Sequence, residues 1–400
     1  MSTQISTESS NIDIRSSAPA WKEFRERMPV ARTFAYFDHA AVSPFPQPTY
    51  DAVSDWATNM TECGDAQWSQ WATRLEVARS LSAKLINAED DEIALVRNTT
   101  EGINYVAEGF PWREGDNVVI PADEFPSNRY PWQHLARRGV ETRLVPCQNG
   151  RVEVDDIAAA FDGRTRMLAA SWVDYSTGWR NDPAVLCELA HSRGAYFFLD
   201  AIQGLGVFPL DVQSIPVDFL AADGHKWLLG PEGAGLFYLR REHLDLLDPM
   251  GVGWNSAVNA SDYTQQDWKL KPTAARYEGG TYPVGCFVGL AASLAFLAEY
   301  PQPDTGARVL HISQHAAEEL KSAGAEIVSF REVPADSTAP DRRSGIVAFT
   351  WPGQDPVQVR KRCLEQDVVI SCRAGRLRIS LHAYNTEEDV ARLISALQAG

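Results

Sequence analysis

A lysine and an aspartate, each beside a short apolar run, are the residues of this chain best suited to chemistry. Residues 195–199 form an apolar run that ends in Asp200, which predicts a buried parallel strand with a carboxylate at its C-terminal end. Residues 217–221 form a second run, and Asp223-Gly224-His225-Lys226 follows it. Ligands of open α/β sheets bind outside the carboxyl ends of the strands. The pattern therefore places Asp200 and Lys226 at one crevice.

Two interpretations of Lys226 are open from its surroundings. The simpler one is an ordinary surface lysine in a strand-to-loop turn. In the other, Lys226 holds pyridoxal phosphate (PLP) covalently and Asp200 pairs with the protonated pyridine nitrogen, a lysine and acid pair that this cofactor requires. Gln203 stands three residues after Asp200, within reach of the phenolic oxygen of the cofactor. Together, the two motifs favour the PLP interpretation.

These motifs and several others in the same order resemble the class V aminotransferase family of fold-type I PLP-dependent enzymes. That family includes cysteine desulfurases, selenocysteine lyase, kynureninase and isopenicillin N epimerase-like proteins, and the resemblance runs from about Phe37 to the C-terminus. It implies an α/β fold of the PLP-dependent transferase type, with a mostly parallel seven-stranded sheet in a large domain and a smaller α+β C-terminal domain. Strands alternating with helices argue independently for a mostly parallel sheet covered on both faces.

The elements that position these residues fall into three expected regions. We expect a flexible tail over residues 1–20, because the first residues are rich in serine and threonine and lack an apolar centre. A large PLP-binding domain is expected over residues 21–290, with its N-terminal segment packed on the small domain. The small C-terminal domain is expected over residues 291–400.

Hydroxyl groups before a helix are the first candidates for holding the cofactor phosphate. Residues 98–102 read Asn-Thr-Thr-Glu-Gly and stand directly before a helical segment, and a helix N-terminus is an anion site. Taken alone, an ordinary threonine N-cap explains the same pattern. The resemblance implies that Thr99 and Thr100 bind the phosphate and that His225 contacts it as well. Desulfurases usually carry serine where this chain has Asp223. The Asp223 carboxylate would repel a phosphate unless the side chain is turned away or paired.

Residues 276–281, Arg-Tyr-Glu-Gly-Gly-Thr, resemble the Arg-Phe-Glu-Ala-Gly-Thr motif of the family. In relatives the threonine of this motif reaches the phosphate of the neighbouring subunit. The resemblance therefore implies a homodimer with shared active sites, to which Thr281 contributes.

Aromatic and small residues are the candidates for contacting the cofactor ring and the substrate. Desulfurases carry Glu-His where this chain has Glu124-Phe125; Phe125 is expected to stack on the ring, but it cannot carry protons. The alternative for Phe125 is a buried loop anchor. Tyr175 stands where desulfurases have asparagine and is expected to contact the ring oxygen or the substrate. Ala40 belongs to a motif of small residues that lines the substrate entrance, and we expect the neighbouring His39 to be structural.

An arginine near the C-terminus is the candidate for substrate recognition. Residues 378–386, Arg-Ile-Ser-Leu-His-Ala-Tyr-Asn-Thr, match the C-terminal motif of the family. The resemblance implies that Arg378 holds the substrate α-carboxylate, for which the guanidinium fork is suited. A structural salt bridge is the alternative.

A short segment before this motif bears on the type of reaction. Cysteine desulfurases carry a nucleophilic cysteine on a mobile loop, whereas here only residues 371–375 separate two expected strands. So short a loop is too limited in reach to carry Cys372 into the crevice. We therefore expect β-elimination at a C–S or C–Se bond by a desulfurase-like lyase without a mobile catalytic cysteine. An aminotransferase and an isopenicillin N epimerase-like epimerase remain alternatives, with a non-catalytic family member as a remote one.

The charge and the cysteine content of the chain limit the kinds of partner that it can bind. The formal net charge of the 400 residues is −16, which argues against binding nucleic acid or anionic membranes, and no apolar run approaches the length of a bilayer span. The six cysteines show no paired spacing, which disfavours a zinc site or a disulfide framework. We expect a cytoplasmic enzyme that acts on a small amino acid, with no metal, nucleic acid or membrane partner.

Overall fold

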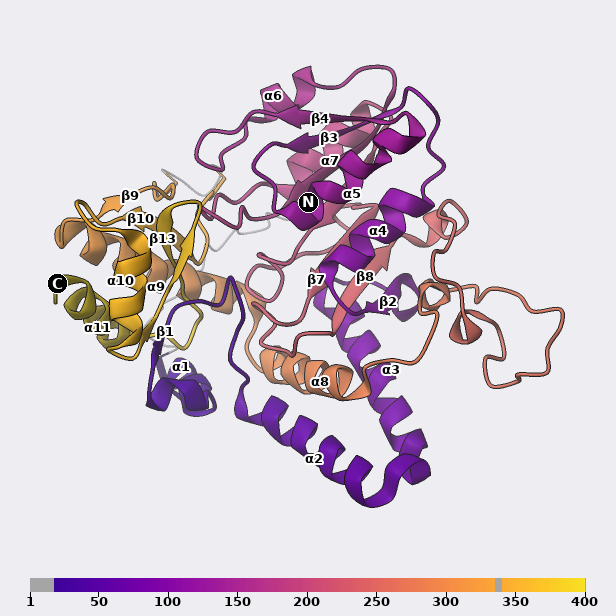
Figure 1. Cartoon of the computed structure of the whole chain (residues 1–400), viewed down its shortest axis with the longest axis horizontal. Helices are drawn as coiled ribbons and strands as arrows, with labels where there is room; N and C mark the ends of the chain where they lie inside the picture. Colours follow the sequence, from indigo (N-terminus) through magenta and orange to yellow (C-terminus); the bar gives the residue numbers. More distant parts are fainter. Residues whose placement is uncertain (1–17, 335–339, 400) are drawn as a thin grey trace, which may run out of the picture.

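The computed structural model describes residues 18–334 and 340–399. A larger lobe surrounds a sheet, and a smaller lobe at one side contains most of the last hundred residues (Figure 1). The tail expected over residues 1–20 lies outside the described residues except for 18–20, which begin helix α1 (Ala18–Glu26).

The larger lobe is built on a seven-stranded sheet in the order β2-β8-β7-β6-β5-β3-β4. Strands β7, β6, β5, β3 and β4 pair in parallel, while β8 runs antiparallel to both of its neighbours. The expected mostly parallel sheet is therefore confirmed. The strand bounds are Ile93–Val96 (β2), Asn117–Pro121 (β3), Glu141–Val145 (β4), Thr165–Ser171 (β5), Tyr196–Asp200 (β6), Phe219–Asp223 (β7) and Gly235–Leu239 (β8).

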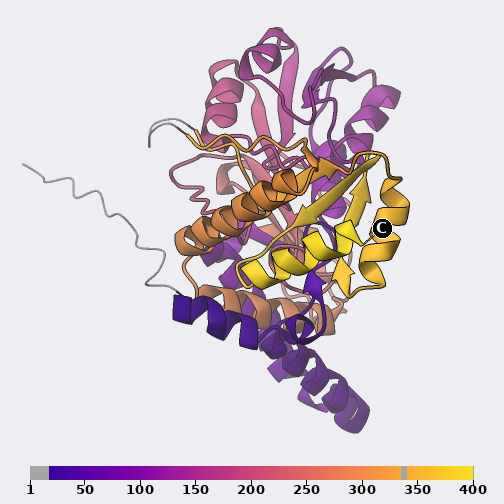
Figure 2. The ribbon, with the colours of Figure 1, turned by 90° about the vertical axis from the view of Figure 1, so that its left-hand side faces the viewer.

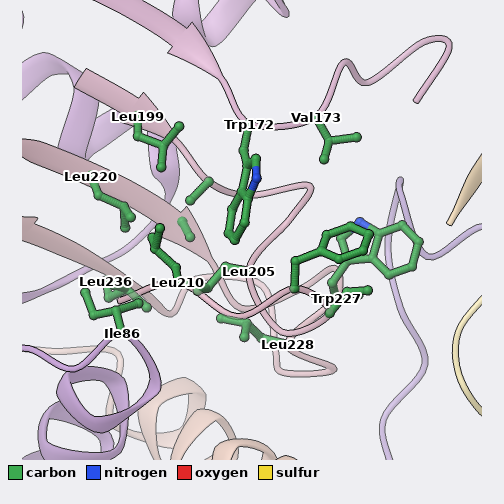
Figure 3. Packing of buried hydrophobic residues seen from close by; sticks show 14 of the residues in the cluster. Ile86, Trp172, Val173, Leu199, Leu205, Leu210, Leu220, Trp227, Leu228 and Leu236 are labelled. Carbon is green, nitrogen blue, oxygen red and sulfur yellow. The ribbon is translucent and has the colours of Figure 1, made fainter. Parts of the chain in front are cut away.

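Both faces of this sheet are buried, which explains why its central strands read as continuous apolar runs. Along β6, Phe197 and Leu199 join one hydrophobic cluster and Phe198 joins another on the opposite face. Figure 3 shows the first of these clusters, in which Leu199 and Trp227 lie with other apolar side chains beneath the strand ends. The helices of this lobe are α2 (Gln47–Cys63), α3 (Trp68–Leu85), α4 (Thr99–Gly109), α5 (Tyr130–His134), α6 (Val154–Ala159), α7 (Pro183–Ser192) and α8 (Val284–Ala298).

The smaller lobe contains a four-stranded antiparallel sheet in the order β12-β13-β10-β9. Figure 2 shows this sheet with its helices in front. The elements are α9 (Gln302–Ser322), β9 (Glu326–Ile327), β10 (Ile346–Thr350), α10 (Pro356–Leu364), β11 (Val368–Val369), β12 (Ser371–Arg373), β13 (Arg376–Ser380) and α11 (Glu387–Gln398). The expected division between residues 290 and 291 falls inside α8, and the domain bounds stay a prediction.

The N-terminal segment packs on the smaller lobe. Strand β1 (Ala35–Tyr36) pairs in parallel with β11, and Asp38 forms an isolated bridge with Ser380. Arg25 of α1 donates two hydrogen bonds to the carboxylate of Asp389, at 2.7 and 2.9 Å. The two ends of the described chain thus meet at the smaller lobe (Figure 1).

Two expectations about local structure need correction. Asp223 is the last residue of β7 and does not follow the strand, because the strand begins at Phe219, two residues later than its apolar run. Residues 371–375 do not form a simple loop: Ser371–Arg373 is strand β12, joined to β13 by a tight turn at Ala374 and Gly375. Both central residues of this turn have positive φ, as in a type I′ hairpin.

No single helix in the described part of the chain is long and apolar enough to cross a membrane. Within those same residues, α8 and α9 are together long and apolar enough, but the chain bends by 85° between them.

Candidate active site

A cavity of about 300 Å³ opens at the carboxyl ends of the central strands. Loops after the strands of the larger lobe line it, together with the N-terminal segment and β12 and β13 of the smaller lobe. Ten of the predicted site residues line this cavity: Ala40, Thr99, Thr100, Phe125, Tyr175, Asp200, Gln203, His225, Lys226 and Arg378. Of the predicted residues only Thr281 lies elsewhere.

Lys226 is buried just after β7 and lies under an aromatic ring. Its Nζ is 5.6 Å from the ring centroid of Phe125, and the side chain belongs to the cavity wall. Burial lowers the pKa of Lys226 to about 8, against the raising effect of the Asp200 carboxylate. A neutral amine is therefore available near physiological pH, which suits a nucleophile or a base.

Asp200 ends β6 at the base of the same cavity. Burial raises the pKa of Asp200 to about 6, and the backbone N–H of Ile202, donated at 3.2 Å, and the charge of Lys226 oppose this rise. Glu124 is a second buried carboxyl nearby, and burial raises its pKa to about 8. It accepts a hydrogen bond from the backbone N–H of Ser171 at 2.6 Å and another from the Ser171 hydroxyl. Ser171 lies opposite Asp200 in the register of β5 and β6.

The first residues of α4 line the cavity. The cap of this helix is Asn98, whose side chain accepts from the N–H of Glu101 at 2.9 Å, so the threonine N-cap considered above is not what is found. Thr99 Oγ1 is buried and has no hydrogen-bond partner among the described residues. The Thr100 hydroxyl donates to Ser127 Oγ at 2.8 Å. The helix therefore offers free donor groups to an anion.

Asp223 and His225 form a close pair beside Lys226. The Oδ1 atom of Asp223 lies 3.0 Å from Nδ1 of His225. Both atoms are buried, and neither has a partner with hydrogen-bond geometry within the described chain. Asp223 is thus a cavity-wall residue that is only 4% exposed.

Gln203 is held on both sides of its amide. It donates through Nε2 to the carbonyl of Ala40 at 3.0 Å and accepts at Oε1 from Nε1 of Trp227 at 2.8 Å. These bonds fix the N-terminal segment against the residue that follows Lys226. His39 lies outside the cavity wall, and its ring nitrogens contact the Ser380 carbonyl and the Tyr384 hydroxyl, each at 2.8 Å. That environment favours the structural interpretation of His39.

Phe125 and Tyr175 meet at the mouth of the cavity. Their rings pack edge to face, with centroids 5.1 Å apart and planes at 74°. Phe125 is 41% exposed, so it is not the buried loop anchor considered as its alternative. Its uncovered ring surface is available for stacking.

Arg378 lies almost fully buried at the side of the cavity formed by the smaller lobe. Its guanidinium donates to Ser371 Oγ at 3.1 Å, to the Tyr175 carbonyl at 2.5 Å and to Asp38 Oδ1 at 3.2 Å. The structural salt bridge considered as the alternative for Arg378 is thus present, with Asp38. Three of the five N–H donors of an arginine are used here, which leaves capacity for a ligand in the cavity.

Cys372 stands between two residues that face the cavity. Ser371 contacts Arg378, and Arg373 lines the cavity. Successive side chains of a strand point to opposite faces, so the side chain of Cys372 in β12 points to the other face of the hairpin. Cys372 itself pairs with Leu377 of β13 and is absent from the cavity wall.

Thr281 lines a neighbouring cavity of about 620 Å³. Two residues at the start of α4, Asn98 and Thr100, line both cavities. Thr281 is therefore close to the predicted phosphate position but on the outer side of the helix start.

Comparison with known proteins decides the family. The model of the family "Aminotransferase class-V" matches residues 35–393. A probable cysteine desulfurase from Methanothermobacter thermautotrophicus is 31% identical over 400 aligned residues, covering 94% of this chain and 97% of the relative. The chain belongs to the class V aminotransferase family.

Solved structures agree with this assignment. The cysteine desulfurase CsdA from Escherichia coli, in an S-sulfonic acid form, is 26% identical with a TM-score of 0.83, covering 94% of this chain and 97% of that one. A variant of C-DES with glycine covalently linked to its PLP cofactor is 21% identical and shares the fold, with a TM-score of 0.85 over 93% of this chain and 98% of its own. This class V aminotransferase is a PLP-dependent enzyme of the α/β type.

The residues of the cavity fit that cofactor. One end offers the start of α4 with the unpartnered hydroxyl of Thr99 for a phosphate. The middle holds the Lys226 amine and the far wall holds the Asp200 carboxylate. The volume of about 300 Å³ is at the lower end of the range for small-molecule sites.

The sequence did not indicate four polar residues of the cavity wall: Asn98, Ser127, Ser171 and Arg373. Ser171 is the last residue of β5, so the rule that ligands bind at the carboxyl ends of strands was a signal that could have found it. Ser127 and Arg373 come from a loop and a short edge strand, whose orientation depends on tertiary packing.

Proposed function

We propose that this enzyme cleaves the C–S or C–Se bond of a small amino acid by β-elimination, without placing sulfur on Cys372. The observation that carries the proposal is the position of Cys372 in a paired hairpin, on the face turned away from the cavity. The relatives named as cysteine desulfurases support a sulfur amino acid as substrate. A desulfurase thiolate must reach the sulfur of the substrate, and this hairpin holds Cys372 in place.

Proton removal at the substrate Cα is assigned to Lys226. When bound, PLP supplies the electron sink for the charge that develops at this carbon. The pKa of about 8 gives Lys226 a useful neutral fraction near neutral pH. Asp200 is proposed to hold the proton on the pyridine nitrogen, and Phe125 to cover the ring.

The substrate is proposed to be oriented by the smaller lobe and the N-terminal segment. Arg378 binds the α-carboxylate with its remaining N–H donors, while Asp38 and Ser371 fix the guanidinium plane. Tyr175 and Ala40 flank the substrate, and Gln203 contacts the phenolic oxygen through its second amide proton.

The phosphate is proposed to bind Thr99, Thr100 and His225, together with Thr281 of the partner subunit. Thr281 and the start of α4 share the walls of the adjoining cavity, which supports a homodimer in which this cavity is filled by a second copy. We also propose a cytoplasmic location, because each of the six cysteines, all of them in the described part of the chain, is free.

Product analysis tests the reaction. Purified enzyme is incubated with cysteine, cystine and selenocysteine, and we expect pyruvate and ammonia together with a released sulfur or selenium species. Accumulation of alanine with sulfur bound to the protein would replace the lyase by a desulfurase. A D-amino acid, or a keto acid formed only with an amino acceptor, would instead indicate epimerase or aminotransferase chemistry.

A further inference from the structure

The pair formed by Asp223 and His225 is an unusual feature for a site that must accept a phosphate. Asp223 ends β7 at the cavity wall, only 4% exposed. A carboxylate and a phosphate repel each other strongly when no water separates them. The desulfurases that this chain resembles carry a serine at this position, which creates no such conflict.

The contact between the two side chains determines where a proton must be. Asp223 Oδ1 and His225 Nδ1 are 3.0 Å apart, and neither atom has a partner with hydrogen-bond geometry among the described residues. If Nδ1 carried a lone pair, it would face the ionised carboxylate as a second acceptor in a buried site. A proton on Nδ1 makes this contact favourable, because an ionised carboxylate accepts and cannot donate.

A histidine that donates through Nδ1 to a carboxylate can carry a second proton on Nε2. An imidazolium has two N–H donors and one positive charge. Placed between a carboxylate and a phosphate, it would offset both negative charges and remove their repulsion. Lys226 is the other cation near Asp223, since the Asp223 charge raises the pKa of that amine.

We propose that Asp223 is a positioning residue that holds His225 as an imidazolium, so that His225 binds the cofactor phosphate as a charged donor. Asp223 therefore strengthens phosphate binding through His225, although without His225 the Asp223 carboxylate would weaken phosphate binding. The inference rests on the proposed cofactor site, and it goes beyond it by assigning a role to a carboxylate that departs from the pattern of the desulfurases.

A double-mutant cycle on cofactor affinity tests this proposal. PLP is removed from the enzyme, and its dissociation constant on rebinding is measured by absorbance for the parent, Asp223→Asn, His225→Gln and the double variant. We expect Asp223→Asn to weaken PLP binding about tenfold in the parent, as for the loss of one close charge pair. In the His225→Gln background we expect the same change to tighten binding, because the carboxylate is then only repulsive.

Pyridoxal, which lacks the phosphate, is the matched control ligand. Pyridoxal can still react with Lys226. Any effect of Asp223→Asn on the reactivity of the Lys226 amine should therefore appear with both pyridoxal and PLP. We expect Asp223→Asn to weaken pyridoxal binding far less than PLP binding, because pyridoxal has no phosphate for His225 to bind. Equal weakening of pyridoxal and PLP would overturn the proposal, and so would tighter PLP binding by Asp223→Asn when His225 is present.

Two controls distinguish a failure of this inference from misfolding of a variant and from failure of the proposed function. Far-UV circular dichroism and thermal unfolding establish that each variant is folded, and Asp223→Ala replaces Asp223→Asn in the cycle if the latter does not fold. Failure of the proposed function would appear as the wrong products with PLP still bound, whereas failure of this inference leaves the products of the parent enzyme unchanged.

Discussion

The hydroxyl of Ser371 accepts a hydrogen bond from Nε of Arg378 at 3.1 Å. This contact joins neighbouring strands of the hairpin and fixes which face of β12 is turned to the cavity. Arg373 lines the cavity and Ser371 pairs with the cavity residue Arg378, so Cys372 between them is turned to the other face. Arg378, which we propose to hold the substrate, and Cys372 therefore lie on opposite faces of the hairpin.

Replacing Cys372 by serine should leave turnover nearly unchanged. Because the side chain faces away from the cavity, we expect kcat/KM on cysteine or cystine within about threefold of the parent, under roughly 1 kcal/mol in transition-state terms. The exposed Cys63, changed to serine, serves as the control. Loss of turnover on cysteine with cofactor binding retained would show that Cys372 is the nucleophile.

Lys226→Ala should abolish covalent attachment of the cofactor. The parent protein, reduced with borohydride, should carry PLP on one peptide that contains residue 226, as detected by mass spectrometry. Lys269→Ala, at an exposed lysine outside the cavity, should retain the adduct. A reducible adduct in Lys226→Ala would mean that another amine holds the cofactor.

The rate of PLP capture by the cofactor-free enzyme should rise with pH through about 8. Burial lowers the pKa of Lys226 from 10.5 to about 8, so the amine is protonated and unreactive below this pH and neutral above it. Stopped-flow absorbance should therefore show a midpoint near 8. A rate that continues to rise toward pH 10.5 would indicate an exposed lysine with an ordinary pKa.

Arg378→Lys should raise KM for the amino acid more than it lowers kcat. Lysine keeps the charge but loses the planar fork that is held by Asp38 and Ser371. We expect an increase in KM of roughly tenfold or more, consistent with loss of one charge-assisted hydrogen bond. Arg376→Lys, on the same strand but bonded to Asn149 at the surface, is the matched control. Equal effects in both variants would point to a general defect of β13.

Mixing two inactive variants should restore activity if subunits share sites. Lys226→Ala lacks the amine, and Thr281→Asp places a carboxylate where the phosphate of the partner subunit is proposed to bind. A hybrid dimer contains one site without either change, so activity should reappear after mixing and exchange of subunits. A monomer by light scattering that binds PLP with full affinity would contradict the shared site.

Strands buried on both faces could be predicted from the sequence because burial imposes continuous apolar runs. Ile93–Val96 and Asn117–Pro121 are strands that are buried at every residue. The positions of Asp200 and Lys226 followed from the rule that ligands bind at the carboxyl ends of strands, and the structure brings both to one cavity.

The hairpin at residues 371–376 could not be predicted in the same way. Strand β12 is polar and short, and its turn uses Ala374 with φ 49°, where glycine or asparagine would signal a type I′ turn. The pairing of Asp223 with His225 also escaped prediction. It depends on β7 starting at Phe219, so that Asp223 is held in the strand rather than in the loop that follows.

Gln203 connects the carbonyl of Ala40 to the ring of Trp227, and Asp38 of the same N-terminal segment bridges Ser380. The wall of the cavity therefore contains residues translated among the first and among the last of the chain. During synthesis on the ribosome, Ala40 can meet Gln203 before β13 exists, whereas Asp38 must wait for Ser380. A nascent chain that already exposes Lys226 consequently lacks the part of the cavity wall that Arg373 and Arg378 supply.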